Sequence, residues 1–374
     1  MHIDKRPPIG VSASIILALC AGNAAHADDA FNTAISGYGS IGGTYTGDSA
    51  YTYILNGSQF KATNSQFDLG TDSRIGLQAT FTYGTDLSVI VQEEAKRRGS
   101  DNFSLGTEWA FLQYKPTDDL KLRLGRVALA TFLMSDFREV GYAQTWFHAP
   151  NEVYSSEPFE TLDGAQALWH VNLGPVGLDL EGEYGTTSEA IQVNGDLLNV
   201  SAKSAYNVAA AISYKDFLLR IAETVVSFPE TLPLGPTTVV NYLDHDKFLS
   251  VGFQYDNGTA IVLTEWAKRS ENAVPIVNLP LAAFSSWYVA GGWRFGKLTP
   301  MVTYAGEKWN ESLSNSAVSY TTPSISLRYD LVTNVALKAQ FSRPQADNAS
   351  YWTDRNPNSG ERVNVFSLGA DFVF

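Results

Sequence analysis

Apolar and polar residues alternate along most of the chain with a period of two. Ile75, Leu77 and Phe81 share one face of the segment "RIGLQATFTY", whereas the opposite face is polar or small. Such alternation is typical of a β-strand that has one apolar face. Three residues, 84–86, separate this run from a second alternating run, so the pair predicts a hairpin with a tight turn.

The same hairpin unit recurs along the chain. Its short turns are expected at 84–86, 117–119, 174–176, 215–216, 257–258, 296–297 and 330–334. Longer connections are expected at 46–72, 95–107, 128–163, 185–205, 227–246, 270–284, 310–320 and 344–362. With a first strand in "AISGYGSIGGTYT" and a last one in "VNVFSLGADFVF", the pattern predicts an all-β, 16-stranded antiparallel barrel. Short turns would lie at one end of this barrel and long loops at the other.

Strands of a water-soluble barrel or sandwich also alternate, so the periodicity alone leaves that alternative open. The separation of short turns from long loops instead favours a transmembrane barrel with periplasmic turns and extracellular loops. The polar faces carry mainly Ser, Thr, Gln, Gly and charged residues, which suits a wet lumen. Aromatic residues gather at strand ends, as interfacial girdles require. A closed barrel of this strand number leaves an aqueous channel that side chains cannot fill.

The start of the chain predicts export from the cytoplasm. The basic pair "KR", an apolar run and the motif "AHA" at 25–27 predict a secretory signal peptide over residues 1–27. Residues 28–374 would then form a single barrel domain. The only cysteine, Cys20, falls in the signal peptide, so the mature domain is expected to form no disulfide.

The net charge and the histidines exclude several function classes. The chain carries a formal net charge of −13, and loss of the signal peptide adds one negative charge, which opposes nucleic-acid binding. The mature domain has three histidines, His148, His170 and His245, without a nucleophile motif or zinc spacing. We therefore expect no enzyme activity, no cofactor and no metal site.

Several segments match a known family. They are "ISGYGSIGGTY", "SRIGLQATFTYGTDLSVIVQEE", a long third loop after "LRLGR" and the terminal "LGADFVF". In these the chain resembles the Gram-negative general porins, which are sixteen-stranded and usually trimeric. The resemblance implies an outer-membrane channel whose third loop folds into the barrel, with its acids facing arginines on the opposite wall. The terminal Phe372 and Phe374 resemble the signal that the barrel-assembly machinery reads.

The resemblance and the strand parity together indicate site residues. Four acids of the third loop are expected at the pore constriction: Asp136, Glu139, Glu152 and Glu157. Four cations are expected on the lumen-facing wall: Arg74, which matches a family arginine, and Arg123, Arg328 and Lys338. Four aromatic residues are expected to anchor the loop to the wall: Phe137, Tyr142, Trp146 and Tyr154. Some of these acids could equally be solvated loop charges.

The predicted function is passive diffusion of small hydrophilic solutes and ions, with a mild cation preference. Near Glu108 and Asp163, where the family has further arginines, this chain has acids, which favours cations. The expected partners are membrane lipid and lipopolysaccharide, two further copies in a homotrimer, and the assembly machinery. Two alternatives stay open: a substrate-specific channel with a binding site at the constriction, and an outer-membrane enzyme or adhesin on a barrel scaffold.

Overall fold

The structure is a computed structural model, and it describes residues 31–47, 67–98, 102–157, 159–193, 196–233, 239–271, 283–309, 319–346 and 362–374. The expected signal peptide and Cys20 lie outside the described residues. Within the described residues, no helix is both long and apolar enough to span a membrane.

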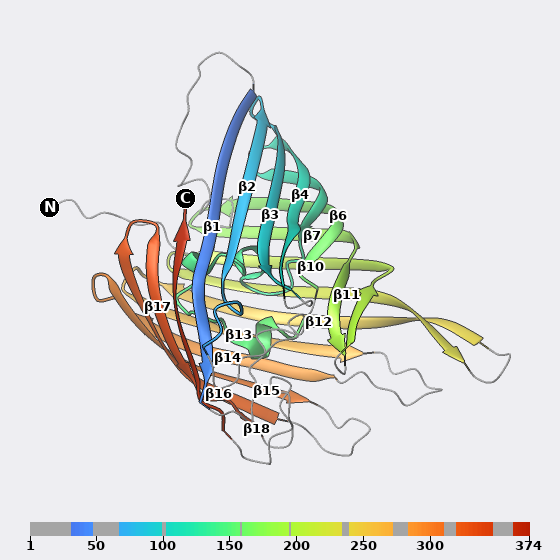
Figure 1. Cartoon of the computed structure of the whole chain (residues 1–374). Coiled ribbons are helices and arrows are strands. Elements are labelled where there is room, and N and C mark those ends of the chain that lie inside the picture. The colour runs from blue at the N-terminus through green and yellow to red at the C-terminus, as the bar shows by residue number, and fades with distance from the viewer. Residues whose placement is uncertain are drawn as a thin grey trace.

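Sixteen strands of the described chain close into one antiparallel barrel, as the sequence predicts (Figure 1). Each strand pairs with its neighbours in the chain, and β1 pairs with both β2 and the last strand, which closes the sheet. The strands are β1 (Phe31–Thr46), β2 (Arg74–Tyr83), β3 (Leu87–Arg97), β4 (Phe103–Thr117), β5 (Leu120–Ala128), β6 (Thr161–Leu173), β7 (Val176–Thr186), β10 (Ser204–Tyr214), β11 (Phe217–Pro233), β12 (Val239–Asp256), β13 (Ala260–Glu271), β14 (Phe284–Trp293), β15 (Leu298–Trp309), β16 (Ser319–Val332), β17 (Val335–Ser342) and β19 (Val365–Val373).

All seven short turns lie where the alternation predicts them, but two of the long connections consist mostly of barrel strand. β3 and β4 leave only residues 98–102 between them, and β11 and β12 leave only 234–238. The expected loops at 95–107 and 227–246 are therefore too long. Backbone pairing continues there beyond the alternating runs from which the loop bounds were drawn. β8 (Ser188–Val193) and β9 (Asp196–Ser201) form a small separate hairpin, and β18 (Gln345–Ala346) is a short addition to β16.

The two faces of the wall differ as a membrane barrel requires. Outward-facing side chains are large and apolar, and Leu105 and Leu124 remain 70% and 64% exposed to the surroundings. Inward-facing positions on the neighbouring strands β3 and β6 hold polar side chains such as Gln92 and Gln166, which are buried inside the barrel. An apolar exterior around a polar interior is stable only where hydrocarbon, not water, surrounds the barrel.

Residues 129–160, which we call the third loop, fold into the barrel interior (Figure 1). They contain two short 3₁₀ turns, η2 (Ser135–Phe137) and η3 (Gly141–Ala143), and one helical turn, α2 (Asn151–Tyr154). Near the end of β5, the strand that leads into the loop, Gly125 has a φ of +134°. A Cβ at this position would lie 2.2 Å from the carbonyl oxygen of Ala110, so only glycine fits.

Candidate functional site: the third loop and the barrel wall

One side of the third loop packs against an apolar part of the inner wall on β13–β15. The loop contributes Phe132, Met134, Trp146, Val153 and Tyr154, and the wall contributes Ile261, Leu263, Ala267, Tyr288, Ala290, Met301 and Ala305. We call this contact the apolar attachment. Its core is Trp146, which is 1% exposed and meets the Tyr288 ring edge-to-face at 5.7 Å.

The polar atoms of the buried aromatic residues form hydrogen bonds, which makes the burial of these residues favourable. The Trp146 indole N–H donates to Thr303 Oγ1 at 2.7 Å. The Tyr154 hydroxyl donates to Glu265 Oε2 at 2.6 Å, and Glu265 Oε1 also accepts from the Leu133 amide at 2.7 Å. Glu265 on β13 thus holds the start of the loop through the Leu133 backbone and the later part of the loop through the Tyr154 side chain.

Two of the expected wall cations bind the backbone of the loop. Arg328 Nη1 donates to the carbonyl oxygens of Tyr142 and Gln144 at 2.6 and 2.8 Å. Lys338 Nζ donates to the carbonyl oxygens of Gly141 and Trp146 at 2.6 and 2.7 Å, and pairs with Asp371 at 2.8 Å. Neither cation is paired with a carboxylate of the loop, because the carbonyl oxygens occupy these donors.

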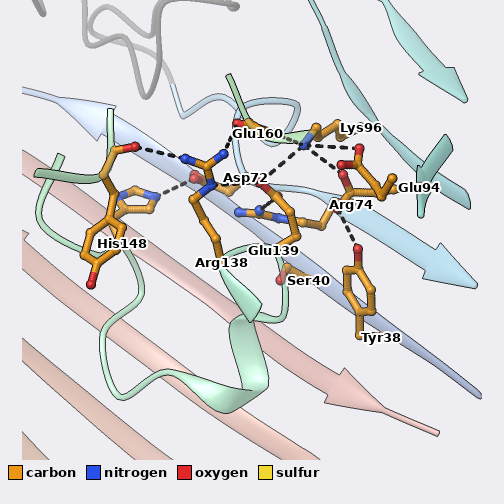
Figure 2. Close-up of polar contacts among 12 residues, drawn as sticks. Tyr38, Ser40, Asp72, Arg74, Glu94, Lys96, Arg138, Glu139, His148 and Glu160 are labelled. Atoms are coloured by element: carbon orange, nitrogen blue, oxygen red, sulfur yellow. Dashed lines mark hydrogen bonds and ion pairs between the residues drawn. The ribbon is translucent and has the colours of Figure 1, made fainter. Parts of the chain in front are cut away.

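The opposite side of the loop meets a network of charges on β2–β4 (Figure 2). Arg74 pairs with Glu139, as the resemblance implies for this arginine. Lys96 Nζ lies 3.3 Å from Glu139 and 3.4 Å from Glu160. Arg138 Nη2 lies 2.9 Å from Glu160. We call these five residues the ionic attachment.

The charges of the ionic attachment continue along the wall and come close to balance. Lys96 also lies 2.9 Å from Glu94 and 3.7 Å from Glu108, and Arg98 lies 2.9 Å from Glu108. Burial works against the ionised form of Glu139, but the Lys96 ammonium and the neighbouring guanidinium groups outweigh it and lower the pKa of Glu139 below its ordinary value. Glu139 is therefore ionised and neutralised by its partners.

A histidine ties the middle of the loop to the wall beside this network (Figure 2). His148 Nε2 lies 2.5 Å from Asp72 Oδ1, and Thr44 Oγ1 donates to the other oxygen of Asp72 at 2.8 Å. The backbone amides of Phe147 and His148 both donate to Gln340 Oε1, at 3.1 and 3.0 Å. These contacts join β1, the turn before β2 and β17 through one segment of the loop.

Asp136 differs from the other expected constriction acids. It lies in η2, is partly exposed, and has no hydrogen bond or ion pair with the residues that the structure describes. Its charge acts on Arg123 and Glu181 of the facing wall. Arg123 donates to Gln113 and Gln166 at 3.0 and 2.9 Å, and its guanidinium lies 4.7 Å from the Phe111 ring centre. The charges of Arg123 and Asp136 thus interact, although the two side chains form no ion pair.

Glu152 and Glu157 are buried in the protein, with 3% and 2% exposure. Burial raises the pKa of Glu152, and a hydrogen bond with Thr322 offsets part of that rise. Burial raises the pKa of Glu157 to about 8, although its Oε1 accepts from the Phe159 amide at 3.0 Å. Glu157 is therefore mainly neutral at pH 7. The constriction role expected for these two acids stays a prediction.

The structure places the four expected aromatic anchors and the two C-terminal phenylalanines. Trp146 and Tyr154 lie in the apolar attachment, and Phe137 packs against its edge. Tyr142 lies under the Arg328 guanidinium, 4.7 Å from its ring centre. The rings of Phe372 and Phe374 lie on the outer face over Gly39 and Gly37, and a Cβ at either glycine would come within 2.4 Å of a ring carbon. Recognition of this end by the assembly machinery stays a prediction.

Sequence reasoning missed Lys96, the cation with the most carboxylate partners in the ionic attachment. Lys96 continues the inward-facing series Ser88, Ile90, Gln92 and Glu94 on β3. A search of that parity beyond the expected strand end would have found it. The Asp72–His148 contact had no comparable signal, because Asp72 lies outside any strand. Among the described residues, no group of three His, Cys, Asp or Glu side chains is arranged to hold a metal ion.

Comparison with known proteins agrees with this architecture. A family model described as Gram-negative porin matches residues 13–349. No curated protein matches the chain by sequence. The fold is similar to the anion-selective porin of Comamonas acidovorans, with TM-score 0.59, 14% identity, and coverage of 92% of this chain and 100% of that chain. It is also similar to the channel DcaP of Acinetobacter baumannii, with TM-score 0.58, 15% identity, and coverage of 92% and 98%.

A third similar structure is Salmonella typhi OmpF in complex with daunomycin, with TM-score 0.56, 13% identity, and coverage of 91% of this chain and 97% of that chain. At such identities these structures support the fold alone. The family model, however, spans most of the chain and agrees with the closed barrel and its inward loop. The chain therefore belongs to the Gram-negative porins, the barrel channels of the outer membrane.

Proposed function

We propose that this porin is a passive diffusion channel for small hydrophilic solutes and ions, with a mild preference for cations and without a catalytic step. The observation that carries the proposal is Asp136, a partly exposed acid of the third loop that belongs to neither attachment and lies inside a polar barrel. Its charge interacts with that of Arg123 on the wall, so solutes would pass between opposed charges.

The cation preference follows from the charges that remain outside the two attachments of the loop. The carboxylates of the ionic attachment are neutralised by their partners, and Arg328 and Lys338 are occupied by loop carbonyl oxygens. Asp136 is then the loop acid that belongs to neither attachment and stays partly exposed. An acid of this kind at a wet constriction favours cations.

Planar-bilayer recording with ion substitution tests both parts of the proposal. The expected result is conductance that rises linearly with salt, with a reversal potential displaced toward the cation equilibrium potential. The folded state of the same sample is checked by circular dichroism. Folded protein without conductance would overturn the channel proposal, and a displacement toward the anion potential would overturn the cation preference alone.

We also propose a homotrimer. A similar barrel, OmpT of Vibrio cholerae, is described in a trimer form, at TM-score 0.56 and 12% identity. Conductance that appears and closes in groups of three equal steps would support three channels in one particle. Single steps from protein of monomer mass in detergent would contradict it.

A second candidate is a substrate-specific channel, which the electrostatic interaction of Asp136 and Glu181 with Arg123 favours. Neighbouring groups of opposite charge suit a solute that carries both signs, such as an amino acid. Such a site would give current block that saturates with solute concentration, whereas a passive channel gives none. An adhesin or enzyme on this barrel would show binding or turnover without conductance.

A further inference from the structure

A small cavity lies between the third loop and the inner wall of the barrel at β15–β17. Its volume is about 30 Å³, enough for one or two water molecules or for a single ion without its hydration shell. Glu152 of α2 lines it from the loop side, and the wall contributes Thr303 on β15, Thr322 and Ser324 on β16, and Ser342 on β17. We call this space the loop cavity. Its lining determines what it can hold.

Glu152 brings a buried carboxylate to the loop cavity. Of the described residues that line the cavity, Glu152 alone is acidic, and none is a lysine or an arginine. The residue is 3% exposed, and it forms no ion pair with the described part of the chain. Burial raises the pKa of Glu152, and hydrogen bonds, rather than a positive charge, oppose that rise. A buried carboxylate without a cationic side chain beside it carries either a proton or a bound cation.

The lysine of β17 cannot supply this positive charge. Lys338 faces inward two residues before Gln340, which lines the loop cavity. Its Nζ, however, donates to the carbonyl oxygens of Gly141 and Trp146 at 2.6 and 2.7 Å and pairs with Asp371 at 2.8 Å. These contacts use all the protons of the ammonium group. The loop cavity therefore gains no cation from β17.

The wall of the loop cavity offers hydroxyl oxygens. The Thr303 hydroxyl accepts the indole N–H of Trp146 at 2.7 Å, and the Ser342 hydroxyl accepts from Gln340 Nε2 at 3.1 Å. Each of these oxygens keeps a second lone pair. The Ser324 side chain forms no hydrogen bond with a described residue, although the residue is only 8% exposed. A buried hydroxyl of this kind beside a cavity indicates that a bound water or ion completes its contacts.

The lining favours a monovalent cation over the common divalent ones, because a single carboxylate balances one positive charge. Ca²⁺ instead gathers about six to eight oxygen ligands, and Mg²⁺ keeps several water ligands for which the cavity has no room. Zn²⁺ and Cu²⁺ prefer nitrogen or sulfur. The His148 ring also lines the cavity, but its Nε2 lies 2.5 Å from Asp72 Oδ1 and its Nδ1 lies 3.5 Å from Ser367 Oγ. Both ring nitrogens are thus occupied.

We propose that the loop cavity binds one alkali cation, sodium or potassium, with Glu152 as its counter-charge and with the hydroxyl oxygens of Thr303, Thr322 and Ser324 among its ligands. The ion joins α2 of the loop to β15 and β16, next to the apolar attachment. It takes the place of the proton on Glu152 and provides a partner for the Ser324 hydroxyl. The proposal is independent of which solutes pass through the lumen, because the cavity lies between the loop and the wall.

The test compares unfolding of the purified barrel in a neutral detergent with sodium chloride, potassium chloride or N-methylglucamine chloride, at one pH and one ionic strength. N-methylglucamine is too large for the loop cavity, so it screens charges without binding there. Sodium or potassium should stabilise the barrel in a saturable manner. At about ten times the dissociation constant, the unfolding equilibrium constant should fall about 11-fold. Equal stability in all three salts would mean that the cavity holds only water, and it would overturn the proposal.

Two variants connect the effect to the loop cavity. Glu152→Gln should abolish the difference between the salts, since the amide carries no charge for a cation to balance. Ser324→Ala keeps the carboxylate and removes one ligand, so it should weaken the cation affinity by about two- to tenfold. Unchanged affinity in Ser324→Ala would overturn the proposal even if Glu152→Gln does not fold.

The matched control is Glu157→Gln, because Glu157 is buried in the same loop at 2% exposure but does not line the loop cavity. It should keep the full difference between the salts. A difference that survives in Glu152→Gln, or that disappears equally in Glu157→Gln, would contradict a cation at Glu152. Neither result bears on the channel function, since conductance is not the quantity measured.

Discussion

The third loop is held in the barrel by two unlike surfaces. The apolar attachment buries Trp146 and Tyr154 on β13–β15, and its polar atoms serve mainly to satisfy the buried rings. The ionic attachment joins Glu139 to Arg74 and Lys96 and gains little from apolar burial. The apolar surface fixes position by packing and is insensitive to salt. The ionic surface also fixes position, but its strength depends on pH and on the charges of neighbouring residues.

The largest effect is expected from Trp146→Ala in the apolar attachment. The side chain is 1% exposed, so its removal leaves a cavity and should lower the free energy of unfolding by about 3–5 kcal/mol. The loop should then loosen and the single-channel conductance should rise. Denaturant unfolding followed by tryptophan fluorescence and bilayer recording measure the two effects.

Trp169→Ala is the matched control for this variant, because Trp169 faces outward and is 49% exposed. It should cost much less stability and leave the conductance unchanged. Equal costs for the two variants would mean that the apolar attachment does not hold the loop.

A smaller effect is expected from Glu139→Gln in the ionic attachment. The amide keeps the shape but leaves Arg74 and Lys96 with one carboxylate fewer, which should cost about 1.5–3 kcal/mol. The loss should shrink as salt rises, unlike that of Trp146→Ala. Unfolding measured at low and high salt gives this difference, with Asp163→Asn as the control. The Asp163 pair with Arg126 is half exposed, so its loss should cost at most about 1 kcal/mol.

The sequence could predict the strands of the barrel wall, but it could predict only some of the contacts that hold the third loop. The two-residue period is local, so it located all seven short turns and the inward parity of Arg74, Arg328 and Lys338. It could not assign their partners, because the third loop has no period that fixes which residue faces the wall. Arg328 and Lys338 bind backbone carbonyl oxygens. Every residue carries such an oxygen, so the sequence does not indicate which one a cation binds.

The acids of the loop likewise differ in ways that the sequence pattern does not indicate. Composition identifies Glu139, Glu152 and Glu157 as equivalent carboxylates in one loop. The structure separates them, since Glu139 pairs with cations whereas Glu152 and Glu157 are buried without an ion pair to a residue that the structure describes. That separation depends on residues far away in the sequence, such as Lys96 and Thr322.

The different surroundings of Glu157 and Glu139 predict opposite pH dependence of their contributions to stability. The pKa of Glu157 is raised from 4.5 to about 8, so its neutral form stabilises the fold below pH 4.5 and this contribution is lost as the pH rises to about 8. The pKa of Glu139 is lowered, so its contribution is present above pH 4.5 and is lost as the pH falls through the lowered value.

Glu157→Gln should therefore stabilise the barrel most at pH 8, relative to the unchanged protein. Between pH 4.5 and 8, the difference should grow by at most about 1.4 kcal/mol per pH unit, the limit for one proton. Unfolding of both proteins across this range measures it, with Glu139→Gln as the variant whose effect should stay constant here and should shrink only below pH 4.5. A difference that does not change with pH would show that Glu157 ionises freely in the folded protein.

The smallest effect on stability is expected from Asp136→Asn, since Asp136 belongs to neither attachment. It has no ion pair with a described residue, so its loss should change the unfolding free energy by no more than about 0.5 kcal/mol. Its charge nevertheless faces Arg123 and Glu181, so the variant should shift the reversal potential toward anions. Glu152→Gln is the control, because a carboxylate buried at 3% exposure cannot act on the solution in the lumen as directly. If Asp136→Asn instead destabilised the barrel and left selectivity unchanged, Asp136 would be a third point of attachment, and the loop would have no acid free to act on passing ions.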